Sequence, residues 1–235
     1  MITVASQPLS ALKHRVYSNE GNPALLAHLP LDAGKVLDVG CGAGANARLL
    51  HERGCRVWGI TLSPGEADLA KPFCEAIQVA DVEDGDFDFS DGFFDCMIFS
   101  HVLEHLVRPE VALKKLCRYL RTGGLVLIAV PNMAHWRIRL RLLRGDWRRD
   151  DSGPMDSTHL HFWSYLTAPG SILAPLQIRS RVAGDPAFPL WPLRRWAPTW
   201  SKRIDRCTGN LWPNLFATQT LLVAEKVSQL ESFGS

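Results

Sequence analysis

The chain has 235 residues, a formal net charge of +2 and 21% charged residues, which fits one α/β domain with insertions and argues against bulk nucleic-acid binding. Its six cysteines show no C-x-x-C spacing, so we expect reduced thiols, no metal site and a cytoplasmic protein. The longest apolar run, residues 125–130, is too short to cross a bilayer, and the N-terminus lacks a signal-peptide pattern.

The first predicted strand is followed at once by a glycine-rich loop. Residues 35–46 read KVLDVGCGAGAN, in which an apolar run typical of a buried parallel strand precedes Gly40, Gly42 and Gly44. Glycine leaves room for a ligand beside the backbone and permits a tight turn. Residues 45–50 then favour a helix whose free N–H groups face the loop. The stretch therefore predicts a ligand above the carboxyl end of this strand.

The loop spacing fits two cofactor classes, and Asp38 separates them. Gly40, Gly42 and Ala45 would satisfy the G-x-G-x-x-G/A pattern of dinucleotide enzymes. A carboxylate two residues before the first glycine would attract a ligand cation but sit poorly beside a pyrophosphate. We therefore expect a ligand that carries an ammonium and a sulfonium group, and the alternative is a glycine turn without a ligand.

The rest of the chain alternates strands with helices. Strands are predicted at residues 56–61, 75–81, 93–100 and 125–130, with helices from Pro64 and from Pro109. We expect the second of these helices to stop at residues 122–124, which contain two glycines. Residues 82–91 form an acidic loop, and two final strands, 177–183 and 217–226, flank an insertion at 186–213. This pattern predicts a doubly wound, mostly parallel sheet of seven strands.

The predicted organisation is a single domain over residues 1–235. A helical segment at residues 1–34, with Leu25, Leu26 and Leu29, precedes the ligand-binding core at 35–132. Residues 133–235 form the acceptor side.

Residues 36–44, with the order of the elements, resemble the first motif of the class I S-adenosylmethionine-dependent methyltransferases. The resemblance implies S-adenosylmethionine as the cofactor and a Rossmann-like methyltransferase fold closed by an antiparallel strand pair. It also implies that the glycines accommodate the methionine part of the cofactor, that Asp38 interacts with its amino end, and that Asp81 accepts from the adenine amino group. The cofactor-binding residues implied are Asp38, Gly40, Cys41, Gly42, Gly44, Thr61, Leu62, Glu66, Asp81, Val82, Ser100 and His101. For Asp81, capping of the following turn is the alternative.

The second strand departs from the commonest family pattern. It ends in Thr61, where most members have an acid that accepts hydrogen bonds from the ribose hydroxyls. Residues 59–63, GITLS, instead resemble a variant found among cyclopropane fatty acid synthases, in which a glutamine five residues past the threonine helps to hold the ribose. Glu66 occupies that spacing. The resemblance implies that Thr61 and Leu62 line the ribose and adenine and that Glu66 contributes a hydroxyl contact; a solvated helix residue is the alternative.

A hydroxyl acceptor needs a base, and an imidazole suits that role at neutral pH. The candidates are His101, His135, His159 and His161. Residues 156–162, DSTHLHF, are similar to a D-x-T-H-x-x-F stretch of methyltransferases from sugar and cell-surface polysaccharide pathways, which implies that His159 faces the acceptor. Residues 100–106, SHVLEHL, resemble the V-L-E-H stretch of the family, which implies that His101 approaches the cofactor or acceptor. We take His159 as the first candidate base and His101 as the second, with a structural histidine as the alternative, and expect Glu104 and His105 to hold the loop.

The predicted function is methyl transfer to a hydroxyl, less readily to an amine or carbon, of a small molecule or a glycan or lipid-linked precursor. Residues 131–136, PNMAHW, are also similar to a methyltransferase-like protein of methionine biosynthesis. The alternative is a catalytically silent subunit of the same fold that binds the cofactor and acts through a partner protein.

Two further clusters bear on the acceptor. Arginines recur at helical spacing in residues 137–148, where they could form a solvated face or contact a phosphate or carboxylate of the acceptor. Four tryptophans of the insertion could stack on sugar rings, touch a membrane surface or fill a small core: Trp191, Trp196, Trp200 and Trp212.

Overall fold

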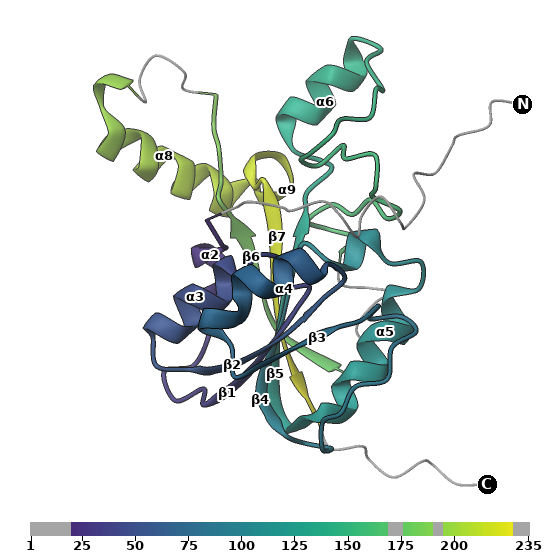
Figure 1. The fold of residues 1–235 in the computed structure, drawn as a ribbon. Coiled ribbons are helices and arrows are strands. Elements are labelled where there is room, and N and C mark those ends of the chain that lie inside the picture. The colour runs from purple at the N-terminus through teal and green to yellow at the C-terminus, as the bar shows by residue number, and fades with distance from the viewer. Residues whose placement is uncertain (1–19, 169–175, 190–194, 228–235) are drawn as a thin grey trace, which may run out of the picture.

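The computed structural model describes residues 20–168, 176–189 and 195–227. These residues form one seven-stranded sheet with helices packed around it (Figure 1). The strands are β1 (Lys35–Val39), β2 (Arg56–Thr61), β3 (Ala76–Val79), β4 (Phe94–Ser100), β5 (Leu120–Pro131), β6 (Leu176–Gly184) and β7 (Gln219–Lys226). They lie in the order β3-β2-β1-β4-β5-β7-β6. Neighbours among β1 to β5 pair in parallel, whereas β7 runs antiparallel to β5 and β6. The predicted doubly wound sheet and its closing antiparallel pair are confirmed.

Helices cover both faces of the sheet. The helices α2 (Pro23–Leu26) and α3 (Ala45–Glu52) bury leucines against Val36 on one face. On the other face, α5 (Pro109–Leu116) packs against Leu37 and Val39. Successive side chains of β1 therefore enter two different cores, which explains why this strand is apolar almost throughout. The helix α4 (Pro64–Ala70) follows β2, and Ser63 accepts a hydrogen bond from the Glu66 N–H as its N-cap.

Three helices lie above the edge of the sheet at which the parallel strands end (Figure 1). They are α6 (Trp136–Leu143), α8 (Pro198–Leu211) and α9 (Pro213–Phe216). The pairing of Pro131 with Gln219 fixes this edge as the place where β5 ends and β7 begins. Among the residues that the structure describes, no helix combines the length and the apolar composition needed to cross a bilayer. Residues 1–19 of the predicted N-terminal segment, residues 169–175 and Trp191 lie outside the described residues.

Two predicted boundaries are wrong. The helix α5 ends at Leu116. A short 3₁₀ helix, η3 (Cys117–Tyr119), then joins α5 to β5. Residues 122–124 lie inside β5 and do not stop a helix, because the buried Leu120 already pairs with Phe94 of β4. The third strand is shorter than predicted, so that Asp81 lies in the loop after β3. In β5 strand pairing overrides the local sequence signal, whereas β3 ends at Val79 because its pairing partner Thr61 is the last residue of β2.

Candidate functional site

The glycine loop adopts a backbone that only glycine accepts easily. Gly40, Gly42 and Gly44 have φ values of +70°, +52° and +84°. A Cβ atom on Gly40 would lie 2.5 Å from Val102 Cγ2, and one on Gly44 would lie 2.7 Å from Ala70 Cα. Close packing therefore requires these two glycines. A Cβ on Gly42 would meet nothing closer than the Glu66 carboxylate, 3.7 Å away, so this glycine leaves the backbone open to a ligand.

Asp38 is buried near the end of β1, just before this loop, and within the described chain its carboxylate makes no hydrogen bond. Its side chain is 1% exposed, and neither carboxylate oxygen has a partner among the described residues. Burial raises the pKa of Asp38 to about 7, and the nearby Asn46 amide offsets part of that effect. A buried carboxylate is costly unless it is paired, so a ligand cation would supply what the protein alone lacks. This fits the ammonium end of S-adenosylmethionine.

Thr61 and Glu66 form a buried pair on the other side of the loop. Thr61 Oγ1 donates to Glu66 Oε2 at 2.9 Å, and the two residues are 3% and 6% exposed. Glu66 is thus not the solvated helix residue that the alternative supposed. Its carboxylate faces Gly42, and Leu62, which follows Thr61 in the chain, is partly buried. Cys41 packs against Gly59, and burial raises the pKa of its thiol, which keeps it protonated.

Asp81 caps the turn that follows β3. Its Oδ1 accepts a hydrogen bond from the Glu83 N–H at 2.9 Å, which is the alternative weighed for this residue. Oδ2 has no hydrogen bond within the described chain, and Asp81 is only half-buried, so one oxygen stays available to a ligand. Val82 beside it is buried.

His101 is held between two acceptors at the end of β4. Its φ is +57°, its Nδ1 lies 3.2 Å from Glu104 Oε1, and its Nε2 lies 3.0 Å from Gln219 Oε1. Burial works to lower the pKa of His101, but the hydrogen bond and charge of Glu104 outweigh it and raise the pKa overall. Both nitrogens thus face acceptors, as suits a protonated ring. Ser100 Oγ next to it accepts from Asn22 Nδ2 at 3.3 Å.

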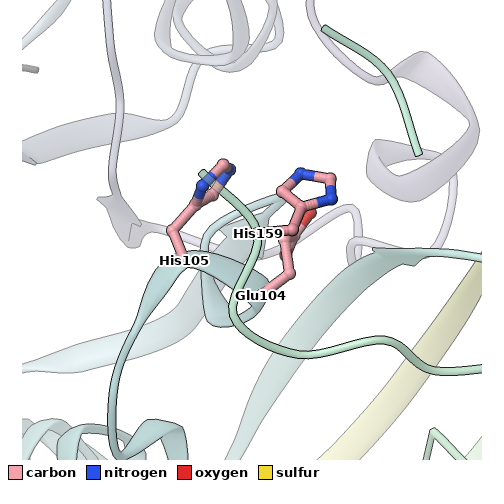
Figure 2. A group of neighbouring side chains, drawn as sticks. All are labelled: Glu104, His105 and His159. Carbon is pink, nitrogen blue, oxygen red and sulfur yellow. The ribbon is translucent and has the colours of Figure 1, made fainter. Parts of the chain in front are cut away.

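His159 reaches the same region from a distant part of the chain. Its Nδ1 lies 3.2 Å from the Pro154 carbonyl oxygen, and its ring centroid lies 4.6 Å from that of His105 in η2 (Leu103–His105). Burial lowers the pKa of His159, so the ring is neutral near pH 7 and able to accept a proton. Figure 2 shows His159, His105 and Glu104 gathered together.

The other two candidate histidines have structural surroundings. His135 accepts from the Arg137 N–H as the N-cap of α6, and burial lowers its pKa to about 4. His161 stacks on Trp163 with ring centroids 5.2 Å apart.

The arginine and tryptophan clusters are largely at the surface. Arg141 of α6 pairs with Asp146 and Asp150, and Arg148 pairs with Asp146 in the segment that follows the helix. The tryptophans of the insertion that the structure describes are exposed and do not fill a core: Trp196, Trp200 and Trp212.

Sequence reasoning missed the residues that connect these groups. Gln219 touches both His101 and Asn22, across 118 and 197 residues of sequence. Thr158 Oγ1 lies 3.0 Å from His105 Nδ1. No local sequence pattern indicates Gln219 as a partner. Thr158 was included only as a residue of the D-x-T-H motif, with no role assigned to it. The expected role of Glu104 in holding the loop agrees with its carbonyl, which accepts from the Leu160 and His161 N–H groups.

The sequence and the fold are similar to those of known methyltransferases. Residues 12–167 match a family model described as a methyltransferase domain. The chloroplastic tocopherol O-methyltransferase of Arabidopsis thaliana is 37% identical over 103 residues, which are 40% of this chain and 29% of that protein. A ubiquinone biosynthesis O-methyltransferase of Acinetobacter baylyi is 30% identical over 104 residues, which are 42% and 44% of the two chains. The chain thus spans less than half the length of these relatives.

Among solved structures, the fold is similar to that of a SAM-dependent methyltransferase from Archaeoglobus fulgidus. The TM-score is 0.60, the sequences are 20% identical, and the match covers 83% of this chain and 87% of that one.

Proposed function

Because this chain belongs to the S-adenosylmethionine-dependent methyltransferase family, we propose that it transfers a methyl group to a hydroxyl of a small molecule or of a glycan or lipid-linked precursor. The observation that carries this proposal is Asp38, a buried carboxylate that has no hydrogen-bonding partner among the described residues and that precedes the glycine loop, where Gly42 leaves the backbone open. A sulfonium compound with an ammonium group complements that site, whereas a pyrophosphate would add negative charge to it.

The residues proposed to hold the cofactor lie around the loop. Asp38 would take the amino end, and the glycine loop the methionine part. Glu66, already held by Thr61, would accept from a ribose hydroxyl, and Asp81 Oδ2 from the adenine amino group. When bound, the cofactor supplies an electrophilic methyl group.

The acceptor side is proposed to use His159 as the base. Alignment of the acceptor oxygen contributes much of the rate in such a displacement. Removal of the hydroxyl proton requires a group that is neutral at pH 7, and the lowered pKa of His159 meets that requirement better than the raised pKa of His101. Two relatives named as O-methyltransferases support a hydroxyl acceptor, whereas a relative from Halorhodospira halochloris named as a sarcosine/dimethylglycine N-methyltransferase, 32% identical over 106 residues, keeps an amine as the alternative.

The first experiment tests the cofactor site. Calorimetric titration with S-adenosylhomocysteine should show micromolar binding that is lost in Asp38→Ala and weakened at least tenfold in Asp81→Ala, an effect of one or two lost polar contacts. Asp84→Ala, an exposed acid three residues further on, is the matched control and should bind as the wild type does. Unchanged affinity in Asp38→Ala would remove the basis of the proposal.

The second experiment tests methyl transfer. The protein is incubated with methyl-labelled cofactor and with polar, lipid-linked and macromolecular fractions of host metabolites. A labelled product that is absent with Asp38→Ala supports the enzyme. Tight cofactor binding without product in any fraction would favour the silent subunit.

A further inference from the structure

A glutamate and two histidines converge next to the proposed acceptor side. One ligand atom from each of Glu104, His105 and His159 lies within 4.8 Å of the others (Figure 2). Glu104 is fully buried and His159 is 6% exposed, whereas His105 is partly exposed and gives the group an opening toward solvent. Two imidazoles and a carboxylate are the ligand set typical of a divalent transition metal ion.

Hydrogen bonds fix which nitrogen of each ring carries its proton. The Pro154 carbonyl can only accept, so Nδ1 of His159 is the protonated nitrogen and Nε2 keeps its lone pair. Thr158 Oγ1 donates to Asp156 Oδ1 at 2.6 Å, and it is therefore an acceptor toward Nδ1 of His105. In both rings Nε2 is therefore unprotonated, and its lone pair is free to bind a metal ion. Metal-bound histidines are usually oriented in this way, through a carbonyl or carboxylate on the other nitrogen.

Glu104 supplies the matching negative charge. Oε1 lies 3.2 Å from His101 Nδ1, but Oε2 is buried and has no hydrogen-bonding partner within the described chain. An unpaired buried carboxylate oxygen is expensive, and a cation would satisfy it.

The backbone brings the two parts of the cluster together. Leu160 and His161 donate their N–H groups to the Glu104 carbonyl at 2.7 and 3.2 Å. Arg149 braces the second loop by donating to the carbonyl oxygens of Asp156 and His159. The cluster is therefore held by the fold before any ion arrives.

We propose that Glu104, His105 and His159 bind a divalent transition metal ion. The ion is held by one oxygen of Glu104 and one nitrogen of each histidine, with further positions left for water or a substrate oxygen. The cysteine spacing led us to expect no metal site, because none of the three ligands is a cysteine and His159 lies 54 positions after His105.

The role of the ion rests on the proposed function. A divalent ion would lower the pKa of a hydroxyl bound to it, so that the proton passes to solvent water, and it would also fix the position of the oxygen. The oxygen would then form its bond to the methyl carbon as the bond from that carbon to the cofactor's sulfur breaks, which leaves S-adenosylhomocysteine. With the ion bound, deprotonation of the acceptor hydroxyl would not require a histidine base. His159 would then be a metal ligand, and it would be the base only in the metal-free protein.

Metal binding is tested directly, without an acceptor. The full chain is freed of metal with a chelator and titrated with Co²⁺, Mn²⁺ and Zn²⁺ by calorimetry, and Co²⁺ binding is also followed by its visible absorption. We expect one equivalent of tight binding. The affinity should fall more than a hundredfold in His159→Gln and Glu104→Gln, which each remove a ligand, and on the order of tenfold to a hundredfold in Thr158→Val, which removes only the orienting hydroxyl.

The control is His51→Gln, which removes an exposed surface histidine and should leave the affinity unchanged. S-adenosylhomocysteine binding by each variant shows that it is folded and tests the cofactor site separately from the metal site. No binding by the wild type at millimolar metal, equal binding by the wild type and the ligand variants, or loss only in His51→Gln would each overturn the proposal.

Discussion

At the scale of single residues, the raised pKa of Asp38 makes ligand binding depend on pH. An ammonium group pairs with the ionised carboxylate, and burial raises the pKa of Asp38 to about 7 in the free protein. The binding-competent form therefore becomes more abundant between about pH 6 and pH 8. We expect the affinity for S-adenosylhomocysteine to rise roughly tenfold over that interval, with one proton released on binding at the lower pH. Calorimetry in buffers of different ionisation enthalpy measures both quantities.

Asp38→Asn provides the comparison. Its affinity should be lower and independent of pH in this interval. Without ligand, a raised acid pKa contributes stability that is present below the unfolded value of 3.8 and lost as the pH rises through about 7. The wild type should therefore lose stability relative to Asp38→Asn between about pH 4 and pH 7, with little further change above pH 8. A difference in the free energy of unfolding that stays constant with pH would contradict the buried, partnerless carboxylate.

At the scale of elements, the glycine loop holds α3 and α4 close together. Gly44 has a φ of +84°, and a Cβ on it would lie 2.7 Å from Ala70 Cα, which belongs to a helix backbone and cannot rotate away. Gly44→Ala should therefore cost the unfavourable backbone, about 1–2 kcal/mol, and a further overpacking cost of about 1–3 kcal/mol. Urea unfolding measures the change.

Gly54 is the matched control for this substitution. Its φ is +82°, but a Cβ there would meet nothing within 4 Å. Gly54→Ala should thus cost only the backbone contribution, about 1–2 kcal/mol. Equal losses in the two variants would show that the contact between the loop and α4 is not tight.

The helix α8 has an unusual distribution of side chains. Its buried residues are small or polar, namely Ser201, Asp205, Thr208 and Gly209, whereas Trp200 in α8 and Trp196 just before it are 65% and 83% exposed. Three cations, Lys202, Arg203 and Arg206, lie on the same helix. Exposed tryptophan beside basic residues is the composition of a membrane-surface helix.

We therefore expect the chain to co-sediment with vesicles that contain anionic lipid, and more weakly at high salt. The double variant Trp196→Ser with Trp200→Ser should bind several-fold less. Trp147→Ser, which removes a tryptophan exposed elsewhere, should bind as the wild type does. Binding that does not respond to the α8 variant would leave only the sugar-stacking role for these tryptophans.

The elements that sequence predicted well are those with local signals. The residues 56–61 predicted for the second strand and Ser63 as the helix cap agree with the structure, because strand composition and capping chemistry are local. The predicted start of β5 at residue 125 was wrong. Leu120 joins the sheet because it pairs with Phe94 of β4, a long-range contact that the residues next to Leu120 in the sequence do not indicate. For Asp81, the sequence allowed two roles, contact with the adenine amino group or capping of the turn after β3. It could not distinguish them, because the position of Asp81 depends on where β3 ends.

At the scale of the whole molecule, the site depends on contacts between distant segments. Gln219 opens β7, Asn22 precedes α2, and His101 follows β4, yet their side chains form one network. Periodicity and motifs carry no information about such partners, which only the closed sheet brings together. Sequence could therefore indicate the cofactor loop, but not what holds His101 or what surrounds His159.

This network gives the last prediction. Gln219→Met keeps the side-chain volume but removes the acceptor of His101 Nε2, both hydrogen bonds to Asn22 and the hydrogen bond that Gln219 Nε2 donates to Asp185 Oδ2. We expect a loss of about 1–3 kcal/mol in the free energy of unfolding, because buried polar groups lose partners. Thr220→Val is the control on the next residue, where a buried hydroxyl has no partner in the described chain, so the loss should be near zero or negative.

The pH dependence separates this network from packing alone. The raised pKa of His101 contributes stability that is fully present below the unfolded value of 6.5 and is lost as the pH rises through the folded value. The cost of Gln219→Met should therefore be larger near pH 5.5 than near pH 9, and NMR titration of the His101 ring should show a lower pKa in the variant. If the cost were the same at both pH values and the ring titrated unchanged, Gln219 would act by filling space, and the raised pKa of His101 would depend on Glu104 and Asp185.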